Sequence, residues 1–410
     1  MSRTRKVAAT AALLAGALAL TACSTNREEA TGGGGGSCDT SKGTLVVGFI
    51  APLSGSLSAL GLGMKNSTDL AVNQANQNCT VPGYRLALQA EDDQATAQIA
   101  GQAATKLASD PNVVGVIGTL NSSTAQSAAP ILANKKIVEI SPANTNPALT
   151  QGDNYQTAPS RPNATYFRTA TTDAIQGPFA AQYMVQKAGK KNIAVIDDGK
   201  TYGAGLASQF AAEAEKLGAT VVAREKVGEK DTDFSGVIAK IRPTNPDAVY
   251  YGGEYPVAGP LSKQLADAGL NIPLMGGDGI VDKTYVSLGG REGDLATNVG
   301  APPEQLPSAK AFIDAYQQAG YSEPYSAYGA LTYDAANVLI QGLAKAVGNG
   351  TFSDATRDGL IQAVQATNLQ GATGAISFDQ YGDTTNKVLT VYSVQGGEFK
   401  PLETGTYPAS

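Results

Sequence analysis

The chain has 410 residues with 30 basic and 36 acidic side chains, a formal net charge of −6, three cysteines and no histidine. Without histidine it cannot form the Ser-His-Asp arrangement of hydrolases, and it lacks the side chain that most often binds zinc or copper. The excess of acidic residues argues against nucleic acid or an anionic lipid surface as the partner. We therefore expect no enzyme, no metal site and no cofactor.

The first 22 residues are typical of an export signal. Three basic residues within the first six positions precede an uncharged, Ala/Leu-rich run at residues 7–20, which is too short to span a bilayer. The run ends at Leu20-Thr21-Ala22-Cys23, which resembles the lipobox of bacterial lipoproteins, where the cysteine is acylated. The alternative is an ordinary signal peptide followed by a chance cysteine. We predict lipidation of Cys23 and anchoring of the exported protein to the outer face of the cell membrane.

Residues 23–43 are predicted to form a flexible tether, because they include five consecutive glycines at 32–36 and little that could be buried. Removing residues 1–22 takes away three basic and no acidic residues, which leaves a net charge of −9. Roughly 370 residues follow the tether, enough for two domains of ordinary size.

Strands and helices alternate strictly in the first half of the remaining chain. Short apolar runs predict strands at 45–50, 84–90, 113–117 and 137–140, and helical spacing predicts helices at 64–77, 95–108 and 124–133. This β-α alternation predicts a parallel, doubly wound sheet.

The same alternation begins again after residue 168. Helices are predicted at 175–187, 205–217, 234–241 and 257–268, strands at 193–196, 220–227 and 248–251, and a closing strand at 387–394 after a helical region at 308–366. We therefore predict an α/β protein with two doubly wound lobes, a hinge and a ligand cleft. The expected first lobe is 44–172 plus 301–387, and the second is 173–300 plus 388–410.

Cys38 and Cys79 remain if Cys23 is lipidated. In an exported protein two such cysteines form a disulfide more often than a reactive thiol. One lies just before the first predicted strand and the other between the first helix and the second strand, which is the same end of a parallel sheet. We predict that they pair.

Several loops carry a family resemblance that spans residues 44 to about 399. The chain resembles the branched-chain amino acid (Leu/Ile/Val)-binding proteins of ABC importers, within the type I periplasmic binding-protein superfamily. Each motif is weak alone, but their order and spacing are specific. The motifs are Pro52-Leu53-Ser54-Gly55, residues 118–124 (GTLNSST), 141–145 (SPANT), 176–178 (QGP), 202–203 (YG), 233–235 (DFS), 250–253 (YYGG) and 275–279 (MGGDG).

Two loops of the first lobe are candidates for holding an α-amino acid. Residues 121–124 follow a strand and open a helix, whose free N–H groups and dipole attract a carboxylate. The resemblance implies that Ser122 binds the ligand carboxylate, although these residues could merely cap the helix. It also implies that Ala143 and Thr145 contact the ligand backbone, whereas a plain Ser-Pro turn is the alternative.

The second lobe is expected to supply the partner of the ligand ammonium. Asp278 stands at the family's acidic position, flanked by glycines that allow close approach, but a turn-forming Asp would look the same. The resemblance implies that Tyr202 forms a wall of the cleft and that Tyr328 adds an aromatic ring from the first lobe.

Two positions depart from the branched-chain pattern. Leu60 stands where relatives often have an aromatic residue, and Glu254 stands where some have tyrosine. Glu254 could be a solvated rim residue beside an aliphatic ligand, or it could point inward and favour a polar or cationic one.

Together these features predict a monomeric, lipid-anchored solute-binding protein of an ABC transporter. It would close on an α-amino acid, preferably a branched-chain one, and deliver it to the permease subunits. The alternatives are a ligand-sensing protein or an importer subunit for another small polar solute, such as a polar amino acid, an amide or urea.

Overall fold

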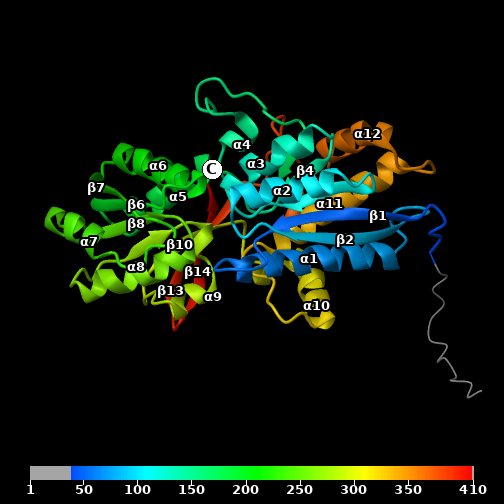
Figure 1. Cartoon of the computed structure of the whole chain (residues 1–410). Helices are drawn as coiled ribbons and strands as arrows, with labels where there is room; N and C mark the ends of the chain where they lie inside the picture. The colour runs from blue at the N-terminus through cyan, green and yellow to red at the C-terminus, as the bar shows by residue number, and fades with distance from the viewer. Residues whose placement is uncertain (1–37, 409–410) are drawn as a thin grey trace, which may run out of the picture. The chain divides into compact units, whose positions relative to one another are not determined.

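The computed structural model describes residues 38–408, so the predicted signal, Cys23 and most of the tether lie outside the described residues. Two main β-sheets organise the described chain (Figure 1). We call each sheet, with the helices packed on it, a lobe. Within 38–408 no helix combines the length and the apolar character needed to span a membrane.

The first lobe contains a five-stranded parallel sheet with the spatial order β2-β1-β3-β4-β5. The strands are β1 (Thr44–Ala51), β2 (Arg85–Asp92), β3 (Val113–Gly118), β4 (Val138–Ser141) and β5 (Tyr166–Arg168). All residues of β3 and β4 are buried, as expected for short apolar strands covered on both faces.

Helices of the first lobe come from two distant parts of the chain. They are α1 (Ser58–Gln77), α2 (Ala97–Ala108), α3 (Ser122–Ala133), α4 (Ala148–Gln151), α10 (Lys310–Ala319), α11 (Gly329–Val347) and α12 (Asp354–Gln365). The late α11 packs against α1, β3 and β4, and Figure 1 shows this yellow-to-orange helix beside the blue and cyan elements. A small hairpin of β11 (Leu369–Gly371) and β12 (Gly374–Ile376) follows α12.

The second lobe contains a seven-stranded sheet with the order β14-β13-β10-β9-β8-β6-β7. Its strands are β6 (Asn192–Asp197), β7 (Thr220–Lys226), β8 (Ala248–Gly252), β9 (Leu274–Gly276), β10 (Leu295–Val299), β13 (Val388–Gln395) and β14 (Glu398–Thr406). Its helices are α5 (Asp173–Gln182), which continues as a π-helical turn (Tyr183–Lys187), α6 (Thr201–Lys216), α7 (Ser235–Ile241), α8 (Tyr255–Asp267) and α9 (Lys283–Ser287).

The predicted class of two doubly wound α/β lobes is confirmed. In each sheet the lobe's first strand lies between its second and third, so the chain winds outward in both directions. The second sheet differs from the prediction, because β13 and β14 are antiparallel additions to its parallel strands and because β10 and β14 were not predicted as strands. The lobe boundaries given above stay predictions. In open sheets of this kind, ligands bind beyond the carboxyl ends of the strands near the point where the strand order reverses.

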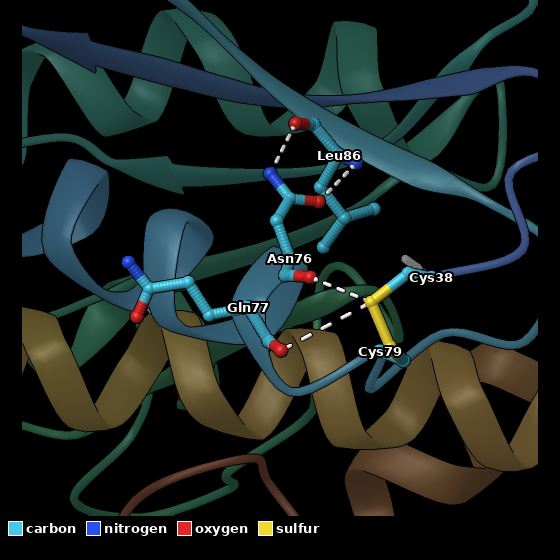
Figure 2. Close-up of a disulfide and its surroundings, with 5 residues drawn as sticks. All are labelled: Cys38, Asn76, Gln77, Cys79 and Leu86. Atoms are coloured by element: carbon cyan, nitrogen blue, oxygen red, sulfur yellow. Dashed lines mark hydrogen bonds between the residues drawn. A yellow bond between two sulfur atoms is a disulfide. The ribbon is translucent and has the colours of Figure 1, made fainter. Parts of the chain in front are cut away.

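Cys38 and Cys79 are paired in the structure, with their Cα atoms 5.4 Å apart (Figure 2). The pair ties the segment before β1 to the turn after α1. Asn76, in the last turn of α1, reinforces this junction: its side-chain amide donates to the Leu86 carbonyl at 2.9 Å and accepts from the Leu86 N–H at 2.7 Å. The end of α1 is thereby fixed to β2.

Candidate functional site

One pocket is lined by loops of both lobes. Its lining residues are Leu60, Leu120, Asn121, Ser122, Ala143, Tyr202, Glu254, Asp278, Gly279 and Tyr328. Every predicted ligand-binding residue except Thr145 is among them. Thr145 is fully buried beside the pocket, where its carbonyl accepts a hydrogen bond from the N–H of Asp173 at 2.8 Å.

The topology explains why these residues meet. Ser122 follows β3, Ala143 follows β4, Glu254 follows β8 and Asp278 follows β9, so each lies beyond the carboxyl end of a parallel strand. Tyr202 lies in the first turn of α6, just after β6. Parallel strands place these ends at one edge of each sheet, and the two edges face the same pocket.

The start of α3 presents hydrogen-bond donors. Asn121 is the N-cap residue, yet its side chain makes no capping bond, and the Ser122 hydroxyl instead accepts from the N–H of Asn146 at 3.4 Å. Within residues 38–408 the N–H groups of Ser122 and Ser123 have no hydrogen-bond partner. A helix start with free N–H groups and a positive dipole end is suited to an anion.

Asp278 provides a carboxyl group, whose charge is opposite to that of the positive dipole end at the start of α3. Its carboxylate is 1% exposed and accepts hydrogen bonds, each 2.8 Å long, from the amide of Gln176 and the hydroxyls of Tyr202 and Tyr328. Burial raises the pKa of Asp278, and these three uncharged donors oppose that effect only in part. Because Tyr328 belongs to the first lobe and Asp278 to the second, their bond also crosses the cleft.

A second buried acid, Asp173, lies behind Asp278. The Gln176 amide bridges the two carboxyl groups, with bonds of 3.2 Å to Asp173 and 2.8 Å to Asp278. Burial, followed by the nearby charge of Asp278, raises the pKa of Asp173 to about 8. Sequence reasoning missed Asp173, because an acidic residue in the first turn of a helix is ordinarily explained by the helix dipole.

Glu254 lines the pocket and also a second, wider cavity beside it. It is only 9% exposed and accepts a 2.6 Å hydrogen bond from the side-chain amide of Asn121, across the cleft. Asp198 lies next to it: burial, and then the charge of Glu254, raise the pKa of Asp198 to about 7. Asn121 was predicted only as part of the helix-start motif at 121–124, without a side-chain role, and Asp198 was not predicted.

Arg168, at the end of β5, supports the loop that follows β4. Its guanidinium is fully buried, contacts the Asp383 carboxylate at 2.6 Å, and donates to the carbonyls of Asn144 at 3.1 Å and Asn146 at 2.8 Å. These bonds fix the backbone of residues 144–146. The loop containing Ala143 and Thr145 is thus positioned by an ion pair that does not line the pocket.

A second, wider hollow lies between α1 and α10 beside the disulfide, with mostly polar lining that includes Asp69, Asn73 and Arg85. None of the predicted ligand-binding residues lies there. Within residues 38–408 no three His, Cys, Asp or Glu side chains are grouped in a way that could hold a metal ion.

Two doubly wound lobes whose carboxyl-end loops share one buried pocket define a two-lobed, cleft-type ligand-binding protein. The family model described as periplasmic binding protein matches residues 44–398, and the chain belongs to this family.

Among curated proteins, the chain is 29% identical over 361 residues to the Leu/Ile/Val-binding protein BraC3 of Rhizobium johnstonii, covering 88% of this chain and 94% of that protein. It is 30% identical to the leucine-, isoleucine-, valine-, threonine- and alanine-binding protein of Pseudomonas aeruginosa, with 85% and 89% covered.

Solved structures agree with this assignment. The leucine-binding protein LivK of Thermotoga maritima superposes with a TM-score of 0.79 at 28% identity, covering 89% of this chain and 99% of that one. LivJ of Streptococcus pneumoniae, solved in complex with isoleucine, superposes with a TM-score of 0.76 at 25% identity, covering 88% and 99%. The predicted family is therefore confirmed.

Proposed function

We propose that this chain is the extracytoplasmic solute-binding subunit of an ABC importer and that it captures an α-amino acid between its lobes. The observation that carries the proposal is the pairing of opposite ends in one pocket: free N–H groups at the start of α3 and the buried carboxylate of Asp278. An α-amino acid carries a carboxylate and an ammonium group on one carbon, so it matches both ends. The family and the names of the relatives support transport rather than catalysis.

In this proposal the ligand carboxylate binds the N–H groups and hydroxyl at Ser122, with Ala143 and Thr145 on the adjoining loop. The ligand ammonium binds Asp278, which has no cationic partner of its own among the described residues. A cation placed beside a buried carboxylate gains more than it would in water. The first lobe binds first, and closure adds Tyr202 and Asp278 from the second lobe.

Closure follows from where the ligand contacts lie. Ligand favours the closed form only by the interactions that exist there and not in the open form, namely those across the cleft. The permease subunits would then recognise the closed shape. We propose a monomer, because a single chain supplies both lobes and all the residues that line the pocket.

The ligand side chain would lie against Leu60, Leu120 and Ala143, which form an apolar wall. Relatives named for leucine, isoleucine and valine, and in one case also for threonine and alanine, favour a side chain of branched, compact size.

Calorimetry tests the zwitterion clamp directly. An amino acid that binds should lose its affinity when the side chain is kept but either the α-ammonium or the α-carboxylate is removed. Valine, isobutylamine and isovalerate form one such set, and threonine with 1-amino-2-propanol forms another. Equal binding of a one-charge analogue would contradict the proposal.

Lipid anchoring through Cys23 is part of the proposal, although Cys23 lies outside the described residues. It is supported by the lipobox-like sequence at residues 20–23. Cys23→Ala should leave the exported protein unprocessed or released into the medium, measured by fractionation and intact mass. Correct cleavage with unchanged membrane retention would contradict the anchor.

A further inference from the structure

The pocket lining includes two polar side chains as well as apolar ones. Asn121, from the loop after β3, and Glu254, from the loop after β8, both line it. The Asn121 side-chain amide donates to Glu254 Oε1 at 2.6 Å, so the two residues meet across the cleft. They are 3% and 9% exposed, which means that water reaches them poorly in this closed arrangement.

The amide of Asn121 is left with an unsatisfied acceptor. A carboxylate can only accept, so the amide nitrogen must face Glu254 and the amide oxygen must face elsewhere. Within residues 38–408 this oxygen, Asn121 Oδ1, is buried and has no hydrogen-bond partner. A buried acceptor without a donor is unfavourable, because it has lost its hydrogen bonds to water without replacement. A donor on the ligand would remove that penalty.

Acidic side chains outnumber basic ones around Glu254. Asp198 lies against it, and Lys200, which is paired with Glu229, lies close enough that, although burial opposes the change, the charge of Glu254 raises the pKa of Lys200 as well. The same four side chains line a second cavity on the far side of Glu254, so the carboxylate lies between the two cavities. With Lys230, which lines the same cavity, two lysines therefore face three carboxyl groups. An excess of acceptors and of negative charge favours a donor or a cation and disfavours a hydrocarbon.

We propose that Asn121 and Glu254 form a side-chain subsite, and that the ligand is an α-amino acid whose side chain carries a hydrogen-bond donor: a hydroxyl, an amide or a cationic nitrogen. This inference rests on the proposed function, because it assumes that an α-amino acid occupies the pocket. The apolar wall of Leu60, Leu120 and Ala143 covers the carbon atoms of the side chain, and the two polar side chains receive its donor.

A purely aliphatic side chain fits this subsite poorly. It would cover Glu254 and Asn121 Oδ1 without offering a donor to either, and a site built from acceptors rejects ligands that leave them unpaired. Glu254 therefore acts as a specificity-determining residue, with the Asn121 amide positioned by it.

Pairs of amino acids with equal shape test the subsite in the unaltered protein. Valine and threonine differ by a methyl against a hydroxyl, and leucine and asparagine differ, beyond their shared CH₂, by an isopropyl group against a carboxamide. Calorimetry should show that the polar member of at least one pair binds about tenfold or more tightly than its aliphatic partner. Lysine and arginine, tested alongside, examine the cationic case.

Glu254→Leu should reverse this preference by removing the carboxylate and extending the apolar wall. The matched control is Glu398→Gln, which neutralises an exposed glutamate at the start of β14 and should change neither ligand's affinity. Thermal unfolding of each variant confirms that it folds.

The outcomes separate this inference from the function on which it rests. Donor-bearing ligands preferred by the wild type, with that preference lost in Glu254→Leu, support the subsite. Aliphatic ligands that bind as tightly as their polar partners, or more tightly, overturn the subsite while the amino-acid function stands. No binding by any α-amino acid overturns both. Because the paired ligands decide the question in the wild type, the test still holds if a variant fails to fold.

Discussion

Two buried carboxylates, one in the Arg168 network and one in the pocket, are ionised under very different conditions. Asp383 is fully buried and is paired with an equally buried guanidinium 2.6 Å away. Burial is the largest single effect and opposes its ionisation, but the charge of Arg168 and the hydrogen bonds from Gln151, Arg168 and Thr150 together outweigh it and hold the pKa of Asp383 below its usual value. Asp278 is just as buried but is surrounded by a glutamine amide and two tyrosine hydroxyls, and its pKa is raised.

The difference is that Asp383 forms an ion pair within the chain, whereas Asp278 has no cationic partner among the described residues. Asp383 has its cation within the chain, so its role is to hold the loop at residues 144–146. Asp278 has donors that orient it but no cation among the described residues, so the remaining charge is available to a cation from outside. In the proposed function the ligand ammonium is that cation. The variants of Arg168 and Asp278 described below test this contrast directly.

The largest expected effect is on Arg168. Arg168→Met preserves bulk but leaves Asp383 as a buried charge without a partner, which should lower the free energy of unfolding by about 3–5 kcal/mol. Urea denaturation followed by circular dichroism measures the change. Adding Asp383→Asn should recover much of the loss, because the unpaired charge is then gone. If the single variant is as stable as the wild type, the pair does not support the fold as we describe.

Asp278→Asn should show the opposite pattern. The ligand ammonium would lose its counter-charge, so binding should weaken by about 3 kcal/mol, which is more than a hundredfold. The free energy of unfolding should stay the same or rise, because a buried carboxylate with a raised pKa has been made neutral. Calorimetry and urea denaturation report the two quantities. Near-native affinity in this variant would remove Asp278 from the site.

Removing the disulfide should lower the stability of the fold without changing ligand affinity. Replacing both Cys38 and Cys79 by serine opens a loop with a sequence separation of 41 residues and should lower the free energy of unfolding by about 2–4 kcal/mol. Ligand affinity should not change, because the pair lies away from the pocket lining. This variant therefore controls for Arg168→Met, since it shows what a loss of stability alone does to binding. Two free thiols found by mass spectrometry in the exported protein would refute the pairing.

The smallest expected effect concerns Glu139 in β4. It is 1% exposed, and its carboxyl oxygens have no hydrogen-bond partner in the described part of the chain. Burial raises the pKa of Glu139 well above its usual value. The folded form therefore holds a proton that the unfolded form releases, so this residue makes stability fall as pH rises above its unfolded pKa near 4.5.

Glu139→Gln should remove that dependence. The variant should gain about 1 kcal/mol over the wild type at pH 8 and much less at pH 4. Thermal or urea unfolding at several pH values measures the difference. A constant difference across this range would show that Glu139 does not titrate on unfolding.

Much of the fold was predictable because buried parallel strands leave a plain pattern of short apolar runs. The start of α1 was not: the prediction began at residue 64, whereas the helix begins at Ser58. Gly61 and Gly63 made that stretch resemble a loop. A Cβ at Gly61 would lie 1.9 Å from the Pro52 carbonyl oxygen, so glycine is required there by packing rather than by a turn. The edge strand β14 was missed as well, because most of its residues are exposed and it contains Pro401.

The site residues, like the fold, were predictable only in part. Residues that directly follow a strand, such as Ser122 and Asp278, could be placed from sequence, because strand ends and helix starts are local signals. The contact between Asn121 and Glu254 joins positions 133 residues apart and depends on how the two lobes meet. The same is true of the Arg168 pair with Asp383, which are 215 residues apart. No local sequence pattern indicates contacts between residues so far apart in the chain.

The disulfide also has a mechanical consequence. Any pull applied through the chain before Cys38 reaches Cys79 through the sulfur bridge at the same time as it reaches β1 through the backbone. The load is thus shared between β1, the centre of the hydrogen-bonded arrangement β2-β1-β3, and the junction of α1 with β2 that Asn76 holds. Tension from the N-terminal side therefore does not peel β1 away from its neighbours one bond at a time. It must move a strand and a helix together, and it enters the lobe at the end of β1 opposite to the pocket.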